Sequence, residues 1–212
     1  MTVKTWNGIP ASNAIQIGDA LGGGYYAGKI AVGGGGTATH YLIVAPKATG
    51  ENDDIAWGPT EVTTGTTSVI TGPTNSIALA LLADTYTAAR WCESLEIGGY
   101  TDWYLPARNE LEVLYYNLKP GTAANNTSYG SNANAVSPEP VSTVYTAGAP
   151  AQTSATAFRT GASGQEFVEG NYWSSTEDDS YDAWRQDFYN GYQNGTNKDY
   201  TRYCRAVRRL II

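Results

Sequence analysis

The first part of the chain alternates between short hydrophobic runs and turns rich in Gly, Thr and Asn. Residues 24–32 have the Tyr, Ile and Val content of a strand, and residues 41–44 form an apolar run that stops before Pro46. Residues 47–76 are rich in Thr, Gly and Asn and contain one short apolar piece at 55–57. This pattern predicts strands joined by turns.

Two segments in the middle of the chain have helical periodicity. Residues 77–95 are rich in Ala and Leu, and we expect one helix there that ends at Gly98 and Gly99. A second helix is expected from about Pro106, a residue favoured at the first helical position, to Pro120. The apolar faces consist of Ala88, Trp91, Cys92 and Leu95 in the first helix and of Leu111, Leu114, Tyr115 and Leu118 in the second.

The last part of the chain returns to strand-like patterns after a long polar stretch. Residues 119–157 are mostly Asn, Ser, Ala, Thr and Pro, which predicts an insertion loop that is at best partly ordered. Strands are expected at 172–176, 181–188 and 201–211. The fold class is therefore α+β, with two helices packed on small antiparallel sheets, in a single domain over residues 1–212.

Composition favours a contact surface and argues against several classes of partner. Only 16% of the residues are charged, and 16 Tyr stand against 3 Phe, so the surface depends on Tyr and small polar groups. A net charge of −7 argues against nucleic acid and anionic membranes as partners. No apolar run is long enough to insert into a membrane, and no signal peptide is visible, so the localisation stays open.

Metal and cofactor chemistry have few candidate residues. The single His40 and the two cysteines, Cys92 and Cys204, do not form a zinc site of the usual spacing. His40 lies in an apolar run, so we expect it to occupy a structural position in a strand. No cofactor is expected.

Paired carboxylates are the remaining candidates for catalysis. Asp178 with Asp182, or Glu166 with Glu177, has the composition of an acid–base pair. Nothing in the sequence places either pair in a cleft, so we do not expect an enzyme.

Residues 178–204 contain no Leu, Ile, Val or Met and consist mostly of Asp, Asn, Ser, Thr and Tyr. If a strand crosses this segment, its two faces differ, because successive side chains point to opposite sides. One face carries Arg185, Asp187 and Tyr189, and the other carries Trp184, Gln186 and Phe188. This composition is typical of a binding surface, and a solvated sheet face without a partner is the alternative.

Four motifs occur in a fixed order along the chain: GGYTDWYLP at 98–106, Glu110-Leu111, YWSSTE at 172–177 and RAVR at 205–208. This set resembles the C-type-lectin-like domain of phage tail and surface proteins, and in particular the variable proteins of diversity-generating retroelements. The resemblance covers roughly residues 15–212. It implies a C-type-lectin-like fold with a long insertion loop and a variable ligand-binding region at 172–208.

In such systems a reverse transcriptase randomises adenines in the template, so Asn codons change into a limited set of residues. Trp184, Gln186, Gln193 and Lys198 are not products of that process, which implies that they are fixed framework. The variable ligand-binding residues implied by the resemblance are Asp178, Asp179, Tyr181, Asp182, Arg185, Asp187, Tyr189, Asn190, Tyr192, Asn194, Thr196, Asn197, Asp199, Tyr200, Thr201 and Tyr203.

The resemblance implies non-covalent binding of a protein ligand on a cell or virion surface. The candidate aromatic anchors are Tyr181, Tyr189, Tyr192, Tyr200 and Tyr203. The alternative is a domain of the same fold with fixed specificity, as an adhesin or a structural part of a virion tail or surface.

Several features depart from related domains. A Cys92–Cys204 disulfide is conceivable, but Ala206 stands where related domains carry the second cysteine, and a buried free thiol is the default for Cys92. The sugar-binding motifs of calcium-dependent lectins are absent. Glu177, Asp178, Asp179 and Asp182 are either a calcium site or, as we favour, a solvated acidic turn.

One further fold resemblance and the cluster of C-terminal arginines do not change this interpretation. The fold also resembles formylglycine-generating enzymes, whose catalytic cysteine pair this chain does not reproduce. The arginines at the end of the chain are expected to pair with nearby carboxylates or main-chain carbonyls; they are Arg202, Arg205, Arg208 and Arg209.

Overall fold

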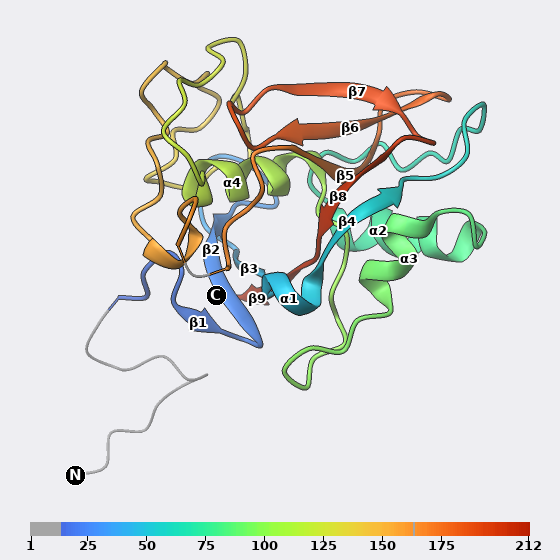
Figure 1. Ribbon diagram of the computed structural model, residues 1–212, viewed down its shortest axis with the longest axis horizontal. Helices are drawn as coiled ribbons and strands as arrows, with labels where there is room; N and C mark the ends of the chain where they lie inside the picture. Colours follow the sequence, from blue (N-terminus) through green and yellow to red (C-terminus); the bar gives the residue numbers. More distant parts are fainter. Residues whose placement is uncertain (1–13, 163) are drawn as a thin grey trace.

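The computed structural model describes residues 14–162 and 164–212, and it contains two β-sheets (Figure 1). The first is a four-stranded antiparallel sheet with the order β1-β2-β3-β9. Its strands are β1 (Ala20–Leu21), β2 (Gly24–Ile30), β3 (His40–Val44) and β9 (Val207–Ile211). His40 begins β3, as predicted.

The second sheet has five strands in the order β4-β8-β5-β6-β7. They are β4 (Glu51–Ala56), β8 (Thr201–Arg205), β5 (Asn171–Glu177), β6 (Asp182–Asp187) and β7 (Gln193–Asn197). All neighbours are antiparallel except β5 and β8, which pair in parallel at Tyr172 and Tyr203.

The prediction of one strand over 201–211 is wrong, because the chain changes sheets within it. β8 belongs to the five-stranded sheet and β9 to the four-stranded sheet. Ala206 lies between them: its N–H donates to the carbonyl of Gly50, and its carbonyl accepts from the N–H of Ala45. This crossing joins the two sheets into one structure.

The prediction of one helix over 77–95 is also wrong. The structure has α2 (Gly72–Leu82) and α3 (Thr87–Glu93), and Ala83 between them is extended. The break allows Tyr86 to turn inward, where its ring packs edge-on against Trp57 with the centroids 5.8 Å apart. Burial of this aromatic ring outweighs the helix propensity of the segment.

The predicted second helix is confirmed as α4 (Arg108–Leu118), which lies between the two sheets (Figure 1). Its apolar face, Leu111, Leu114, Tyr115 and Leu118, is buried. Two acidic residues on α4, Glu110 and Glu112, are buried as well. Two short elements, α1 (Lys47–Gly50) and the 3₁₀ helix η1 (Thr156–Phe158), complete the described structure.

The core has two clusters, one on each side of the five-stranded sheet. The first lies beneath α2 and α3 and contains Trp57, Trp103 and Trp173. The second surrounds α4 and includes Tyr172 and Phe188. Because both faces of β5 contribute to a cluster, this strand is buried along almost its whole length.

Residues 119–157 form an irregular segment, as predicted, but the expectation of partial order is wrong. Lys119, Asn125 and Asn132 are buried, although their side chains are polar. The Nζ atom of Lys119 donates to Asn125 Oδ1 at 2.7 Å, and Asn125 Nδ2 donates to the carbonyl of Pro150 at 2.9 Å. These side-chain hydrogen bonds stand in for the backbone hydrogen bonds of a helix or sheet, which the segment lacks.

The observed mixture of two sheets and a few helices agrees with the predicted α+β class. Within residues 14–162 and 164–212, no helix has the length and apolar character needed to span a membrane.

Candidate ligand-binding surface

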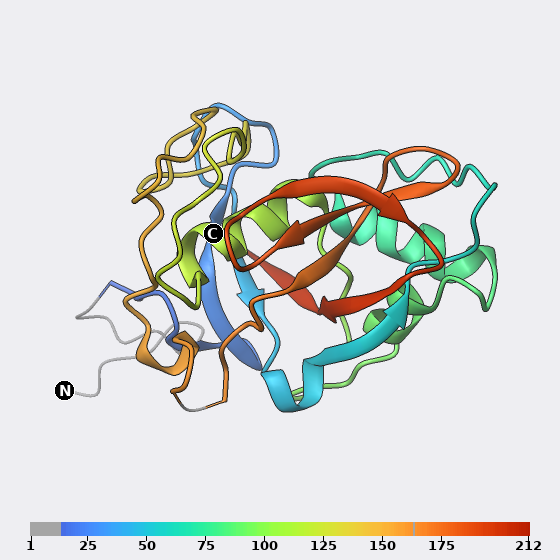
Figure 2. The same ribbon diagram turned by 45° about the horizontal axis from the view of Figure 1, so that its top comes forward.

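The predicted variable residues lie on β6, β7 and β8, in the turns that connect these strands, and in the turn between β5 and β6. Seen from above, these strands and β5 come forward with α2 and α4 behind them (Figure 2). β6 and β7 form an antiparallel pair in which Arg185 lies opposite Asn194 and Trp184 opposite Gly195. The sequence did not predict β7, which has no apolar run of its own.

The two faces of β6 differ in burial in the way that the alternation predicted. Gln186 and, just after the strand, Phe188 are fully buried, whereas Tyr189 in the turn that follows is 51% exposed. Arg185 and Asp187 are half-buried on the outer face. The inner face therefore packs while the outer face meets solvent.

None of the sixteen predicted ligand-binding residues is buried. The exposed ones are Asp178, Asp179, Tyr181, Tyr189, Asn194, Asp199, Tyr200 and Thr201. The half-buried ones are Asp182, Arg185, Asp187, Asn190, Tyr192, Thr196, Asn197 and Tyr203.

Three of the four residues predicted as fixed framework are buried, namely Gln186, Gln193 and Lys198. The fourth, Trp184, is half-buried, and the guanidinium of Arg108 lies 3.8 Å from the centre of its ring. The segment 178–204 thus separates into residues that face solvent and residues that hold the strands in place.

A chain of polar contacts beneath β6 and β7 connects the surface to α4. Arg108 Nη2 donates to Gln193 Oε1 at 3.3 Å, and Gln193 Nε2 donates to Gln186 Oε1 at 3.3 Å. Gln186 Nε2 donates to the Tyr145 hydroxyl at 3.2 Å, which in turn donates to Glu112 at 2.5 Å. Every side chain in this sequence of contacts therefore has a polar partner, and both strands are tied to the helix.

Lys198 and Glu177 form an ion pair with an Nζ–Oε1 distance of 2.7 Å, and their side chains are 0% and 1% exposed. Burial acts to raise the pKa of Glu177. The hydrogen bonds from Lys198 and from the N–H groups of Thr64 and Gly65 outweigh this and hold the pKa below its usual value. Lys198 thereby anchors the β7–β8 turn from beneath.

The five candidate tyrosine anchors are of two kinds. Tyr181, Tyr189 and Tyr200 are at least half exposed and project from turns or strand ends. Tyr192 packs edge-on against Tyr129, with the ring centroids 4.9 Å apart, and Tyr203 stacks on Tyr172 at 5.2 Å. Tyr181, Tyr189 and Tyr200 pack on no other aromatic ring among the described residues, so these three rings are the most open to a ligand.

The acidic turn is held by its own backbone. Asp179 Oδ1 accepts from the N–H groups of Tyr181 and Asp182 at 2.7 and 2.8 Å, and the pKa of Asp179 is lowered by these bonds. Burial and the neighbouring Asp179 raise the pKa of both Asp178 and Asp182. In the described ranges, no three Asp, Glu, His or Cys side chains gather in a way that would hold a metal ion.

The structure separates one of the two carboxylate pairs considered for catalysis. Glu166 pairs with Lys47 at 3.4 Å, and Glu177 pairs with Lys198. Asp178 and Asp182 remain neighbours in the acidic turn, where the N–H of Asp178 donates to the carbonyl of Asp182.

Cys92 and Cys204 are both buried and are free thiols. Burial raises the pKa of Cys92, and the neighbouring Cys204 acts in the same direction. Two thiols from α3 and β8 thus face each other inside the first core cluster.

The predicted pairing of the C-terminal arginines is confirmed. Arg205 donates to the carbonyls of Ala45 and Gln165, and Arg202 donates to that of Thr201. Arg208 forms a bidentate pair with Asp102 at 2.7 and 2.9 Å.

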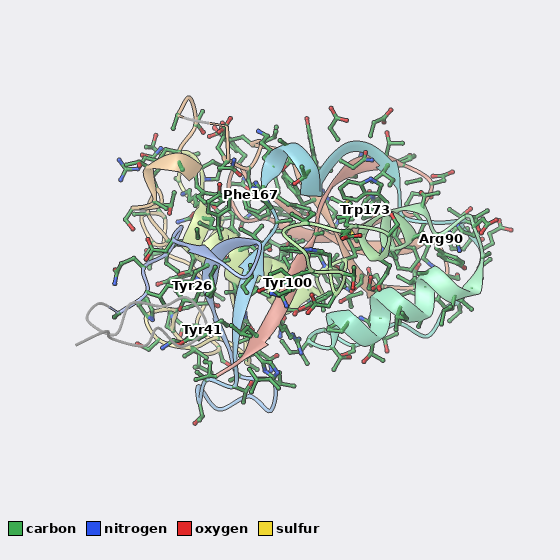
Figure 3. The ribbon with its side chains drawn as sticks, turned by 90° about the horizontal axis from the view of Figure 1, so that it is seen from below. Tyr26, Tyr41, Arg90, Tyr100, Phe167 and Trp173 are labelled. Carbon is green, nitrogen blue, oxygen red and sulfur yellow. The ribbon has the colours of Figure 1, made fainter. Side chains whose placement is uncertain are left out.

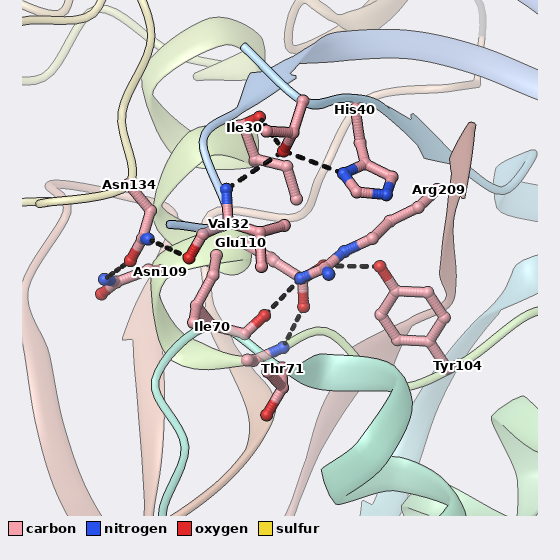
Figure 4. A network of polar contacts seen from close by, with 12 residues as sticks. Ile30, Val32, His40, Ile70, Thr71, Tyr104, Asn109, Glu110, Asn134 and Arg209 are labelled. Carbon is pink, nitrogen blue, oxygen red and sulfur yellow. Dashed lines mark hydrogen bonds and ion pairs between the residues drawn. The ribbon is translucent and has the colours of Figure 1, made fainter. Parts of the chain in front are cut away.

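Arg209 pairs with the buried Glu110 at 2.8 Å (Figure 4). Glu110 also accepts from the Tyr104 hydroxyl at 2.5 Å and from the N–H of Ala107 at 2.8 Å. Arg209 donates a further bond to the carbonyl of Ile70. This network fixes the start of α4 to β9.

The sequence analysis missed three residues that contribute to the surface: Asn171, Tyr129 and Arg108. Asn171 Oδ1 accepts from Arg185 Nη1 at 2.5 Å, and Tyr129 packs on Tyr192. Asn171 immediately precedes a predicted strand, and that was the one available signal. Tyr129 and Arg108 lie far away in the sequence, so only the fold brings them there.

Comparison with known proteins agrees with the motifs that carry the resemblance. A family model described as the Lcl C-terminal domain matches residues 49–208, which include α2 to α4 and every strand of the five-stranded sheet. No curated protein matches the chain. Since the match covers most of the sequence, this chain belongs to the Lcl C-terminal domain family.

Proposed function

We propose that this chain is a C-type-lectin-like ligand-binding domain that displays a diversified surface on β6, β7 and β8. The family match supports a ligand-binding role, and the ordered motifs support the link to variable proteins. The ligand is a protein on a cell or virion surface, bound without covalent chemistry.

The observation that carries the proposal is the division of burial within residues 178–204. All sixteen positions expected to vary are exposed or half-buried, while Gln186, Gln193 and Lys198 are buried. Substitutions at exposed positions usually change stability by less than about 0.5 kcal/mol, so such a surface tolerates many sequences. The buried residues keep the scaffold constant.

The exposed tyrosines supply the recognition chemistry. Tyr181, Tyr189 and Tyr200 offer large contact areas at a low cost in side-chain entropy. Asp and Asn side chains around them supply hydrogen bonds and selectivity for charge. Display of several copies on one particle would raise a weak affinity through avidity.

The DNA that flanks the gene tests the diversification directly. We expect a near-copy of the codons for residues 178–204 that differs from the gene only where the copy carries adenines. Absence of such a copy would refute diversification and leave the second candidate, a fixed-specificity adhesin or virion surface domain. The second candidate rests on the same exposed surface.

A binding experiment tests the surface itself. When a ligand is captured by the full chain, Tyr189→Ser and Tyr200→Ser are expected to weaken binding without loss of folding. The matched control is Tyr100→Ser, which changes a tyrosine that is also exposed but is seen from the opposite side of the molecule (Figure 3). Equal binding by all three variants would place the ligand elsewhere.

A further inference from the structure

Two half-buried arginines on the face of the five-stranded sheet that carries Trp173 have no carboxylate partner among the described residues. Arg205, Arg208 and Arg209 each lie within 4.0 Å of a carboxylate oxygen. In the part of the chain that the structure describes, Arg185 and Arg202 have no such contact. In a protein with a net charge of −7, two guanidiniums on one face that have no carboxylate partner among the described residues require an explanation.

The strand register places these two side chains on the same face. Arg185 on β6 lies opposite Trp173 on β5, and Tyr203 on β8 pairs with Tyr172 on β5. Because side chains alternate, Arg202 shares a face with Asn171, Trp173 and therefore Arg185. Strands are about 4.8 Å apart, and Arg202 lies two residues along β8 from the position level with Arg185, so the Cα atoms of the two arginines lie about 12 Å apart across β5.

Asn171, which shares this face with Arg202, holds the Arg185 side chain. Arg185 Nη1 donates to Asn171 Oδ1 at 2.5 Å, which directs the guanidinium over β5 towards β8. Burial lowers the pKa of Arg185; Asp187 opposes this effect, and Arg202 acts in the same direction as burial.

The guanidiniums keep donors that the protein does not use. Apart from Asn171, the Arg185 guanidinium contacts the Tyr192 ring, 5.1 Å from its centre. Arg202 donates to the carbonyl of Thr201 at 2.9 Å and lies 5.4 Å from the centre of the Tyr200 ring. The Nε atoms of both arginines are buried and have no hydrogen-bond partner among the described residues. Because these Nε atoms are buried, a ligand that brings acceptors would meet the Nη donors of the two half-buried side chains.

We propose that Arg185 and Arg202 together bind the carboxylate of an Asp or Glu side chain on the protein ligand, an inference that rests on the proposed function. A guanidinium presents two parallel donors that fit a carboxylate, and two guanidiniums fit one carboxylate group from both sides.

The acidic residues around the pair define the partner further. Asp182, Asp187 and Asp199 lie on the same variable surface, where they repel a second and a third negative charge. A polyanion with a repeating charge, such as an acidic polysaccharide, is therefore disfavoured. The surface fits a protein patch in which one carboxylate is surrounded by neutral or basic groups.

A random peptide library provides the probe. The full chain is immobilised, and peptides that also bind the Tyr189→Ser/Tyr200→Ser double variant are discarded, so the retained peptides use this surface. We expect the retained peptides to be enriched in Asp or Glu relative to the input library. Binding of a synthesised peptide is expected to fall about tenfold or more in Arg185→Gln and in Arg202→Gln, the scale of one lost charge-assisted hydrogen bond.

Two controls accompany the measurement. Arg90→Gln removes an exposed arginine on α3, which lies on the side away from the variable surface, and should leave binding unchanged (Figure 3). Arg185→Lys keeps the charge without the paired donors and should give an intermediate loss. If an arginine variant fails to fold, replacement of the acidic residue of the peptide by its amide applies the same test to wild-type protein.

The outcomes separate this inference from the proposed function. Retained peptides without enrichment in acidic residues, or with equal binding to the arginine variants, would overturn the arginine assignment and leave the binding surface intact. A complete lack of peptides that distinguish the wild type from the tyrosine double variant would count against the surface itself. Stronger binding of polygalacturonate than of the acidic peptides would overturn the assignment to a protein carboxylate.

Discussion

Replacement of Lys198 by Ala tests whether a buried ion pair supports the variable surface. The Nζ atom of Lys198 lies 2.7 Å from Glu177 Oε1 and also donates to the carbonyls of Val62 at 2.8 Å and Ser180 at 3.1 Å. In the variant, the Glu177 carboxylate stays buried with the N–H groups of Thr64 and Gly65 as donors.

The expected loss is large because one charge loses its counter-ion inside the protein. Removal of one partner of a buried ion pair typically costs about 3–5 kcal/mol, against a total stability of about 5–15 kcal/mol for a domain. A double variant, Lys198→Met with Glu177→Gln, removes both charges and should lose less than the single variant. Asp199→Ala, an exposed neighbour, is the control and should change stability by less than about 0.5 kcal/mol.

Urea unfolding followed by tryptophan fluorescence measures this difference, because Trp57 lies 5.1 Å from Lys198. The pKa of Glu177 is lowered in the folded protein. The charged carboxylate therefore contributes to the free energy of unfolding above pH 4.5, and this contribution is lost as the pH falls through the pKa of the folded protein. The gap between wild type and Lys198→Ala should therefore shrink in acid. A loss below about 1 kcal/mol at neutral pH, or a gap that does not depend on pH, would refute this reasoning.

Three further predictions concern residues whose burial differs, in the variable segment and beneath it. Burial and the neighbouring Glu112 raise the pKa of Glu139 well above 4.5, so the free energy of unfolding of the wild type should decline as the pH rises from 4.5 through the folded pKa. Glu139→Gln should remove this decline when the free energy is measured by urea unfolding at several pH values. The same dependence on pH in both proteins would contradict the prediction. Phe188→Ala should lower the free energy of unfolding by about 3–5 kcal/mol, and Tyr189→Ser by less than about 0.5 kcal/mol, although the two residues are adjacent. Similar urea midpoints for the two variants would contradict the alternation of buried and exposed side chains. Gly191→Ala should lower the melting temperature, because φ is 76° there and a Cβ would lie 2.6 Å from Tyr115 and Tyr145; an unchanged temperature by calorimetry would show that both rings can move.

The alternation along β6 could be read from the sequence because it is a local property. Side-chain direction in a strand reverses at every residue, so Gln186 and Phe188 had to share a face whatever packed on it. The start of α4 after Pro106 was equally local. The elements that the sequence predicted wrongly depend on distant contacts.

β7 is the clearest example of such dependence. Residues Gln193–Asn197 contain Gly195 and no apolar run, and they form a strand because the β6 backbone pairs with them. The division of 201–211 into β8 and β9 has the same origin, since Ala206 is fixed by Ala45 and Gly50. Neither contact can be predicted from the residues of the strand itself.

By itself, the sequence determined the α+β class, the acidic and tyrosine-rich character of the surface, and which residues of 184–189 share a face. Composition and local geometry are sufficient for those properties. The tertiary structure alone decided that Arg185 and Arg202 share a face on either side of β5, while Arg205, Arg208 and Arg209 pair with carboxylates. Pairing between strands far apart in sequence sets those distances, and no periodicity along the chain encodes them.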